Sequence, residues 1–139
     1  MTSPSAQARD RRLAGDPPLV LIVDDSDKNR KLAREVLRAA GFGTLEAARG
    51  DEAIAVAAKR RPDLILLDLR LPDMDGTDVA RKLRDGPETG RIPIVALSAS
   101  PSAGGSDRLL ATGFDGYLQK PIDVATFPDQ VRRYCRSGA

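Results

Sequence analysis

The sequence predicts an α/β domain built on one five-stranded parallel sheet with helices on both faces. Three observations lead to this prediction: short uninterrupted apolar runs, segments of helical periodicity between them, and turn-forming residues at the junctions. An apolar run of four or five residues is typical of a strand that is buried on both faces. Strands that alternate with helices pair in parallel through right-handed crossovers, so we expect a doubly wound fold with five helices and strand order 2-1-3-4-5.

The first strand and helix are the most clearly marked. The run Leu19–Val23 lies between two prolines and the pair Asp24-Asp25, and it is too short for a typical helix. Ser26 or Asp27 can cap the helix that follows, and Gly41 should end it. Its apolar positions recur at helical spacing and should face the sheet: Leu32, Ala33, Val36 and Leu37.

The middle of the chain repeats this alternation. A short edge strand is expected at Gly43–Ala47, and a helix from about Asp51 to Arg60 has alanines on its inner face. The run Leu64–Leu67 predicts a buried strand that stops at Asp68. Turn residues lead from this strand to a helix at about Thr77–Arg84.

The last third gives weaker signals. It predicts two strands, Ile94–Leu97 and Gly116–Gln119, and two helices, at about Asp107–Thr112 and Asp123–Cys135. The Gly104-Gly105 pair leaves the first of these helices marginal. Pro128 lies inside the second helix, so that helix should start late or kink.

Length and composition favour one domain. With 139 residues, 41% of them hydrophobic, the chain can bury one substantial core. We expect a domain over residues 17–136, a disordered N-terminal tail over 1–16 and a C-terminal tail over 137–139, because the tails lack apolar periodicity. The net charge is +2 without a basic block interleaved with aromatics, which argues against nucleic-acid binding. A lone cysteine, Cys135, and the lack of any apolar stretch of membrane-spanning length indicate a cytoplasmic protein without membrane contact.

Polar residues follow four of the five predicted strands, at the point where each strand ends. Asp24 and Asp25 follow the first strand, Asp68 the third, Ser98 the fourth and Lys120 the fifth. In the expected strand order these four ends are contiguous, and ligands of open α/β sheets bind beyond the carboxyl ends of the strands. Each residue alone could be a helix cap, a turn hydroxyl or a surface amine. Together they indicate a functional site.

The residue types restrict the chemistry of this site. The chain has no histidine and one cysteine, which excludes a zinc site of the usual kind and a Ser-His or Cys-His nucleophile. Clustered carboxylates favour a hard divalent cation with oxygen ligands, and Mg²⁺ is the usual occupant. An aspartate can then act as nucleophile toward phosphorus, with Lys120 and Ser98 available to the phosphoryl oxygens.

Four blocks of the sequence resemble the receiver domain of bacterial two-component response regulators: VDDSDKNR, LILLDLRLPDMDG, IPIVALSAS and FDGYLQKPID. The resemblance covers about Leu19 to Arg136 and implies a flavodoxin-like fold and a role in phosphorelay signal transduction. It also implies a stand-alone receiver of the DivK type that is not an enzyme beyond its own phosphorylation and dephosphorylation.

By this resemblance Asp68 is the phosphoacceptor, and Asp24 and Asp25 form the acidic pocket. Asp25, Asp68 and the backbone carbonyl of Arg70 would be direct Mg²⁺ ligands. Lys120 matches the phosphate-binding lysine, Ser98 the switch hydroxyl and Tyr117 the switch aromatic. The implied partners are a sensor histidine kinase or histidine phosphotransfer protein and a downstream protein target, with the chain a monomer or weak homodimer.

Two alternatives belong to other functional classes. A phosphohydrolase with an aspartyl nucleophile would need a second acid two residues after Asp68, where this chain has Arg70. A pseudo-receiver that acts only as a protein-binding scaffold would not need the full set of acids, hydroxyl and lysine. Binding of Mg²⁺ by the unphosphorylated protein would separate the scaffold from the phosphoacceptor.

Overall fold

The computed structural model of the protein describes residues 17–98, 113–120 and 122–135. Within these ranges the strands are β1 (Leu19–Val23), β2 (Gly43–Ala47), β3 (Leu64–Asp68), β4 (Ile94–Ser98) and β5 (Gly116–Gln119). The helices are α2 (Asp27–Ala39), α3 (Gly50–Arg60), α4 (Gly76–Asp85) and α6 (Phe127–Tyr134). The predicted helix at about Asp107–Thr112, the Gly104-Gly105 pair and both expected tails lie outside the described residues.

The five strands form one sheet in the order β2-β1-β3-β4-β5, and every neighbouring pair is parallel, so the predicted topology is confirmed. The most central strand, β3, is buried along its whole length, as its uninterrupted apolar run predicts. Across the sheet Asp68 pairs with Leu97, and Ser98 pairs with Gln119. The carboxyl ends of β3, β4 and β5 therefore lie at nearly the same level, along one end of the sheet.

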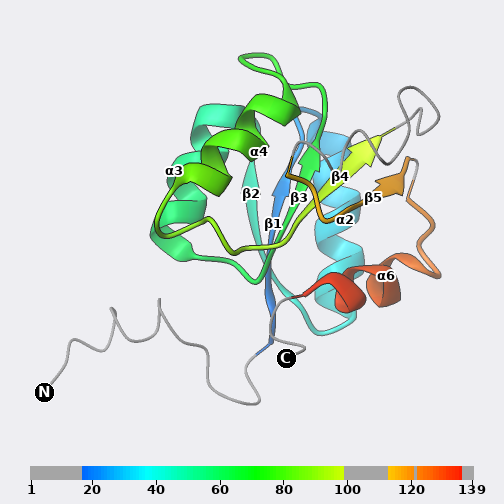
Figure 1. Cartoon of the computed structure of the whole chain (residues 1–139). Coiled ribbons are helices and arrows are strands. Elements are labelled where there is room, and N and C mark those ends of the chain that lie inside the picture. The colour runs from blue at the N-terminus through cyan, green and yellow to red at the C-terminus, as the bar shows by residue number, and fades with distance from the viewer. Residues whose placement is uncertain (1–16, 99–112, 121, 136–139) are drawn as a thin grey trace, which may run out of the picture.

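Helices cover both faces of the sheet (Figure 1), as in a doubly wound domain. Helices α3 and α4 pack on one face over alternate strand residues such as Leu21 and Ile65. Helices α2 and α6 pack on the other face over the intervening residues, such as Val20 and Leu66. Because both faces are covered, the free polar edge at the strand ends is the natural place for a site.

The boundaries of α2 agree with the sequence. The Ser26 hydroxyl accepts a hydrogen bond from the Asn29 N–H at 3.2 Å, and Gly41 has a φ of 98°, which glycine adopts without steric cost. One predicted inward residue is wrong. Leu32 is 40% exposed, whereas Ala33 and Leu37 are the buried residues of this helix.

The last helix starts later than Asp123, its predicted first residue. Asp123 instead begins a turn, in which its carbonyl accepts from the N–H groups of Thr126 and Phe127 and its carboxylate from the Ala125 N–H. Helix α6 then begins at Phe127 and takes Pro128 into its first turn, where a missing N–H costs little. The late start that Pro128 suggested is therefore confirmed.

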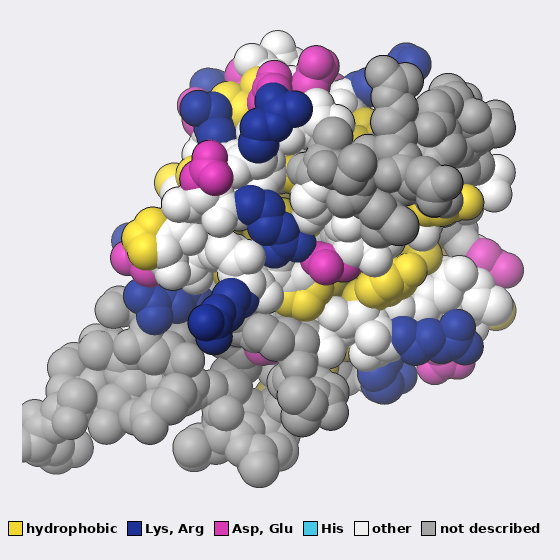
Figure 2. Space-filling model, viewed as in Figure 1, with side chains coloured by type: hydrophobic (Ala, Val, Ile, Leu, Met, Phe, Trp, Pro, Cys, Tyr) yellow, Lys and Arg dark blue, Asp and Glu magenta, His cyan; other side chains and the backbone are white. Residues whose placement is uncertain are grey.

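The surface carries charges of both signs. Figure 2 shows Lys and Arg side chains interspersed with Asp and Glu over the described part of one face, as the nearly balanced composition predicts. Among the described residues, none of the helices has the length and apolar character needed to cross a membrane.

Candidate functional site

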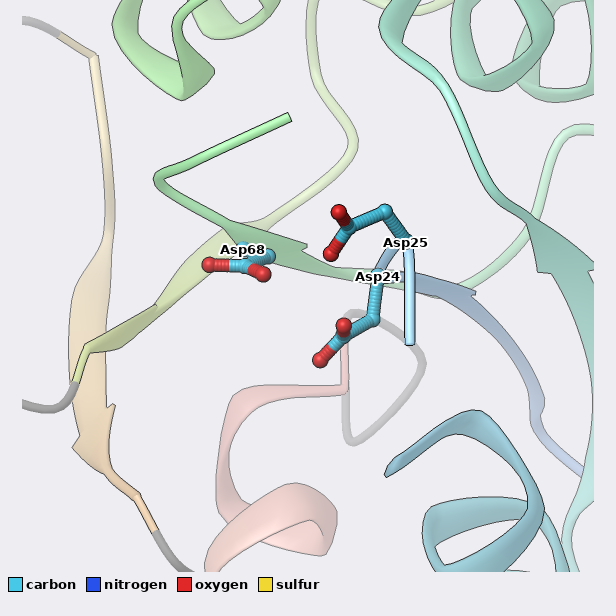
Figure 3. A group of neighbouring side chains, drawn as sticks. All are labelled: Asp24, Asp25 and Asp68. Carbon is cyan, nitrogen blue, oxygen red and sulfur yellow. The ribbon is translucent and has the colours of Figure 1, made fainter. Parts of the chain in front are cut away.

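Three acids meet at the carboxyl edge of the sheet. Asp24 and Asp25 follow β1, and Asp68 is the last residue of the neighbouring strand β3. One carboxylate oxygen from each of the three lies within 4.8 Å of the others, and Figure 3 shows the three side chains grouped at these strand ends. Asp24 is 2% exposed and Asp68 7% exposed, whereas Asp25 is exposed to solvent. The cluster thus combines two buried carboxylates with one that solutes can reach.

Lys120 completes the cluster from the end of β5. Its Nζ lies 3.1 Å from Asp68 Oδ2 and 3.2 Å from Asp24 Oδ2, and its side chain is 21% exposed. Burial disfavours the charge on this amine, but the carboxylates of Asp68 and Asp24 outweigh that effect and raise the pKa of Lys120. Lys120 is therefore a fixed positive charge inside the site and not an ordinary surface amine.

Asp68 is held from two sides. Its Oδ1 accepts a hydrogen bond from the Arg70 N–H at 3.1 Å, and its Oδ2 faces Lys120. Burial raises the pKa of Asp68, and the Arg70 N–H and Lys120 oppose this rise. The same hydrogen bond places the main-chain nitrogen of Arg70 next to Asp68. Whether the Arg70 carbonyl binds metal stays a prediction.

Asn29 and Arg30, which the sequence patterns do not mark as part of the site, help to fix the position of Asp24. The Asp24 carboxylate accepts from the Ser26 N–H at 2.9 Å and from the Asn29 side-chain amide at 3.4 Å. The Arg30 guanidinium donates to the Asp24 carbonyl at 2.6 Å and also pairs with Glu46 on β2. Both residues lie in the first turns of α2, so their closeness to the strand end in sequence was the available signal.

Glu46 in turn receives a second arginine from α2. Arg34 Nη1 lies 2.7 Å from Glu46 Oε2. Burial disfavours the Glu46 carboxylate, but Arg34 and then Arg30 outweigh this and lower the pKa of Glu46. The start of α2 is thereby fastened to the edge strand beside the acidic cluster.

The two predicted switch residues lie on neighbouring strands. Ser98 ends β4, and its carbonyl accepts from the Lys120 N–H at 2.9 Å, so it belongs to the same edge as the acids. Tyr117 on β5 pairs with Ala96 and packs, half-buried, against the core beneath α3 and α4. The structure places Ser98 at the edge that carries the acids and Tyr117 within the adjacent strand, and their switching roles stay predictions.

An open cavity of about 200 Å³ adjoins the cluster between α2 and the segment after β5. Asp24, Asn29 and Lys120 form its polar end, and its other lining residues are Ile22, Leu32, Ala33, Leu97 and Ile122. A small solute can therefore reach Asp24 and Lys120 from solvent on this side of the cluster.

The donor set fits a hard divalent cation. The cluster holds three carboxylates and one ammonium group, which pairs with two of them, so the cluster is negative overall and its potential metal ligands are all oxygens. Oxygen ligands in a partly open site match the preference of Mg²⁺, which keeps several waters and needs only one or two carboxylates.

Comparison with known families agrees with this geometry. Residues 20–132 match the family model described as the response regulator receiver domain. The chain belongs to this family. Among curated relatives, the polar-differentiation response regulator DivK of Brucella anthropi is 37% identical over 118 residues, which span 85% of this chain and 96% of that protein. DivK of Brucella ovis is 36% identical over 115 residues, 83% of this chain and 94% of that protein.

Solved receiver structures share the fold. The chemotaxis response regulator CheY4 of Vibrio cholerae superposes with a TM-score of 0.80 at 32% identity, covering 85% of this chain and 98% of that chain. The receiver domain of a Pseudomonas aeruginosa sensor histidine kinase superposes with a TM-score of 0.78 at 32% identity, covering 85% and 97%. That structure is described as holding a magnesium ion in its active-site cleft. The predicted family and flavodoxin-like topology are thus confirmed, and the protein is a signalling domain of the two-component type.

Proposed function

We propose that this receiver domain accepts a phosphoryl group on Asp68 from the phosphohistidine of a sensor histidine kinase or a histidine phosphotransfer protein. The reaction depends on Mg²⁺, and the phosphorylated domain then changes its affinity for a downstream protein. One observation carries this proposal: a nearly buried Asp68 lies 3.1 Å from Lys120 inside a cluster of three carboxylates that opens to solvent.

The residues that would hold Mg²⁺ are Asp25, Asp68 and the backbone carbonyl of Arg70, with Asp24 beside them. The packing of three carboxylate oxygens within 4.8 Å supports this assignment, since like charges at such distances repel and a divalent cation relieves the repulsion. When bound, Mg²⁺ supplies positive charge that offsets both the carboxylates and the oxygens of an incoming phosphoryl group.

Asp68 is the nucleophile of the proposed transfer. One of its carboxylate oxygens forms a bond to phosphorus while the phosphorus–nitrogen bond to the donor histidine breaks, and the histidine nitrogen keeps that electron pair. The product is an aspartyl phosphate. Lys120 promotes the step by favouring the ionised form of Asp68 and then by pairing with a phosphoryl oxygen.

Ser98 and Tyr117 carry the proposed signal. Once Asp68 bears a phosphoryl group, the Ser98 hydroxyl donates a hydrogen bond to it, and Tyr117 turns toward the space that Ser98 leaves beside β4. The location of Ser98 at the end of β4, in step with the end of β3, supports the first half of this proposal. The half-buried position of Tyr117 on the adjacent strand supports the second.

The experiment that tests the function is a phosphotransfer profile. Sensor kinases from the source organism are purified, labelled with radioactive ATP and mixed briefly with this chain or with its Asp68→Asn variant. We expect one kinase, or one phosphotransfer protein, to pass its label to the wild type in preference to the others and to leave the variant unlabelled. Equal transfer to the variant would reject Asp68 as the acceptor.

A further inference from the structure

Helix α3 begins without a cap of its own. The residue before it, Arg49, is extended with φ −142° and ψ 161°, and its side chain accepts no hydrogen bond from the helix. The first N–H groups of any helix lack partners within that helix and need acceptors from elsewhere. In α3 the acceptors for the first two N–H groups, those of Gly50 and Asp51, come from a distant part of the chain.

Asp73, in the loop after β3, supplies them. Its Oδ1 accepts from the Gly50 N–H at 2.7 Å and its Oδ2 accepts from the Asp51 N–H at 3.0 Å. The hydrogen bonds from Gly50 and then from Asp51 lower the pKa of Asp73, so its carboxylate stays charged at neutral pH. The negative charge also suits the positive end of the helix dipole.

A second contact joins the same loop to the same helix end. A methyl group built on Gly50 would lie 2.5 Å from Cγ of Met74 and 2.8 Å from Cγ2 of Val79. No real side chain tolerates such distances, so glycine at position 50 allows the helix to approach the loop this closely. Asp73 and Met74 thus hold adjacent positions of the loop against α3.

The other side of the loop is bonded to the acidic cluster. Arg70 and Asp75 form an antiparallel bridge across the loop, and the Gly76 N–H donates to the Leu69 carbonyl at 2.9 Å. The Arg70 N–H donates to Asp68 Oδ1. The loop is therefore short and cross-linked, and Arg70 and Asp73 belong to the same bonded unit.

We propose that Asp73 is a positioning residue for the acidic cluster, because its carboxylate holds the loop of residues 69–75 on the start of α3 and so fixes the Arg70 main chain beside Asp68. Asp73 acts through the loop, since both of its carboxylate oxygens are bonded to α3. This inference rests on the proposed function, in which the cluster binds Mg²⁺. It assigns a share of the metal affinity to a residue outside the cluster.

Three variants of the full chain test the proposal. Asp73→Ala removes both hydrogen bonds to α3, whereas Asp73→Asn keeps one acceptor oxygen for the Gly50 N–H and loses the other. Asp51→Ala is the matched control. Its carboxylate lies in the first turn of the same helix and bonds to Arg49 and to the Glu52 N–H, so it is engaged on the helix side and not with the loop.

The measurement is the Mg²⁺ dissociation constant of each folded variant, from NMR titration at low temperature with the Arg70 amide as the reporter and far-UV circular dichroism as the check of folding. Loss of a residue that orients metal ligands typically weakens metal binding about tenfold or more, so we expect about tenfold weaker binding for Asp73→Ala. Asp73→Asn should fall between Asp73→Ala and the wild type, and Asp51→Ala should match the wild type. If the alanine variant is unfolded, the loss in Asp73→Asn relative to Asp51→Ala carries the test.

Wild-type affinity in Asp73→Ala, or in Asp73→Asn where that variant carries the test, would overturn the positioning role and leave the proposed function intact. An equal loss in Asp51→Ala would also overturn it, because the effect would then come from the helix end in general. A wild type that binds no Mg²⁺ at all would instead reject the proposed function, and this inference with it.

Discussion

Lys120 and Asp68 lie 3.1 Å apart, Nζ to Oδ2, at the carboxyl edge of the sheet, although 52 positions separate them in the sequence. Two strands of a parallel sheet bring them together, since β3 ends at Asp68 and β5 ends just before Lys120. Asp24, at the end of β1, joins the same amine at 3.2 Å. Lys120 thus partly neutralises the negative charge of Asp24 and Asp68.

Replacement of Lys120 by methionine should strengthen Mg²⁺ binding. The ammonium group competes with the cation for the carboxylates of Asp24 and Asp68, and two positive centres a few ångströms apart repel by an amount that changes affinity about tenfold.

Asp25→Asn should do the reverse and weaken Mg²⁺ binding, because it removes a proposed ligand. Calorimetric titration at low ionic strength measures both effects. Weaker binding by Lys120→Met would show that the lysine does not oppose the metal.

The Asp68→Asn variant should be more stable than the wild type in the absence of Mg²⁺ at neutral pH. The pKa of Asp68 is raised in the folded state, mainly by burial, so folding disfavours its ionised form. The stability tied to protonated Asp68 is present below the unfolded pKa and is lost as the pH rises through the higher folded pKa. Asparagine does not ionise, so the Asp68→Asn variant does not lose this stability as the pH rises.

Urea denaturation at neutral and mildly acidic pH measures this difference. The advantage of Asp68→Asn should shrink as the pH falls, because the wild-type carboxyl then becomes neutral as well. Added Mg²⁺ should also reduce the advantage, since a ligand that binds only the folded state stabilises it. A variant advantage that grows on acidification would contradict the direction assigned to the Asp68 pKa.

Ser98→Ala should separate phosphorylation from the conformational response. Asp68, Lys120 and the acids remain, so the variant should still accept a phosphoryl group. The missing hydrogen bond to a charged oxygen is worth about 1.5–3 kcal/mol, which corresponds to a shift of about one to two decades in a two-state equilibrium. Amide NMR with beryllofluoride, a mimic of the phosphoryl group, measures the response at Tyr117 and Gln119.

Large shifts are expected in the wild type, small shifts in Ser98→Ala, and restored shifts in Ser98→Thr, which keeps the hydroxyl. Shifts of equal size in the alanine variant would refute the switching role of Ser98.

Much of the fold and site could be predicted because local patterns determine them. The apolar runs fix where strands lie, and burial on both faces leaves their polar last residues at a common edge. This reasoning was sufficient to bring together Asp24, Asp25, Asp68 and Lys120. The first residue predicted for the last helix, Asp123, lies in a turn before the helix, and the late start that Pro128 suggests is the one observed.

The remaining contacts join segments that sequence patterns treat separately. The Asp73 carboxylate caps α3 from 23 and 22 positions away in the chain, and its place in a turn-rich segment does not indicate this contact. Asn29 and Arg30 bond to Asp24, although polar residues on an amphipathic helix such as α2 are ordinary and do not by themselves indicate such contacts. Partners of this kind depend on how loops and helix ends meet in three dimensions, and periodicity carries no information about that.

The most direct test of the account is the intact mass of the chain after incubation with acetyl phosphate. We expect one phosphoryl group on the wild type when Mg²⁺ is present and none when the metal is chelated, because the acids would then repel an anionic donor. Asp68→Asn should stay unmodified in both conditions, whereas the control Asp75→Asn, an exposed carboxylate in the same loop, should be labelled like the wild type. Undiminished labelling of Asp68→Asn would contradict the central claim that Asp68 is the phosphoacceptor.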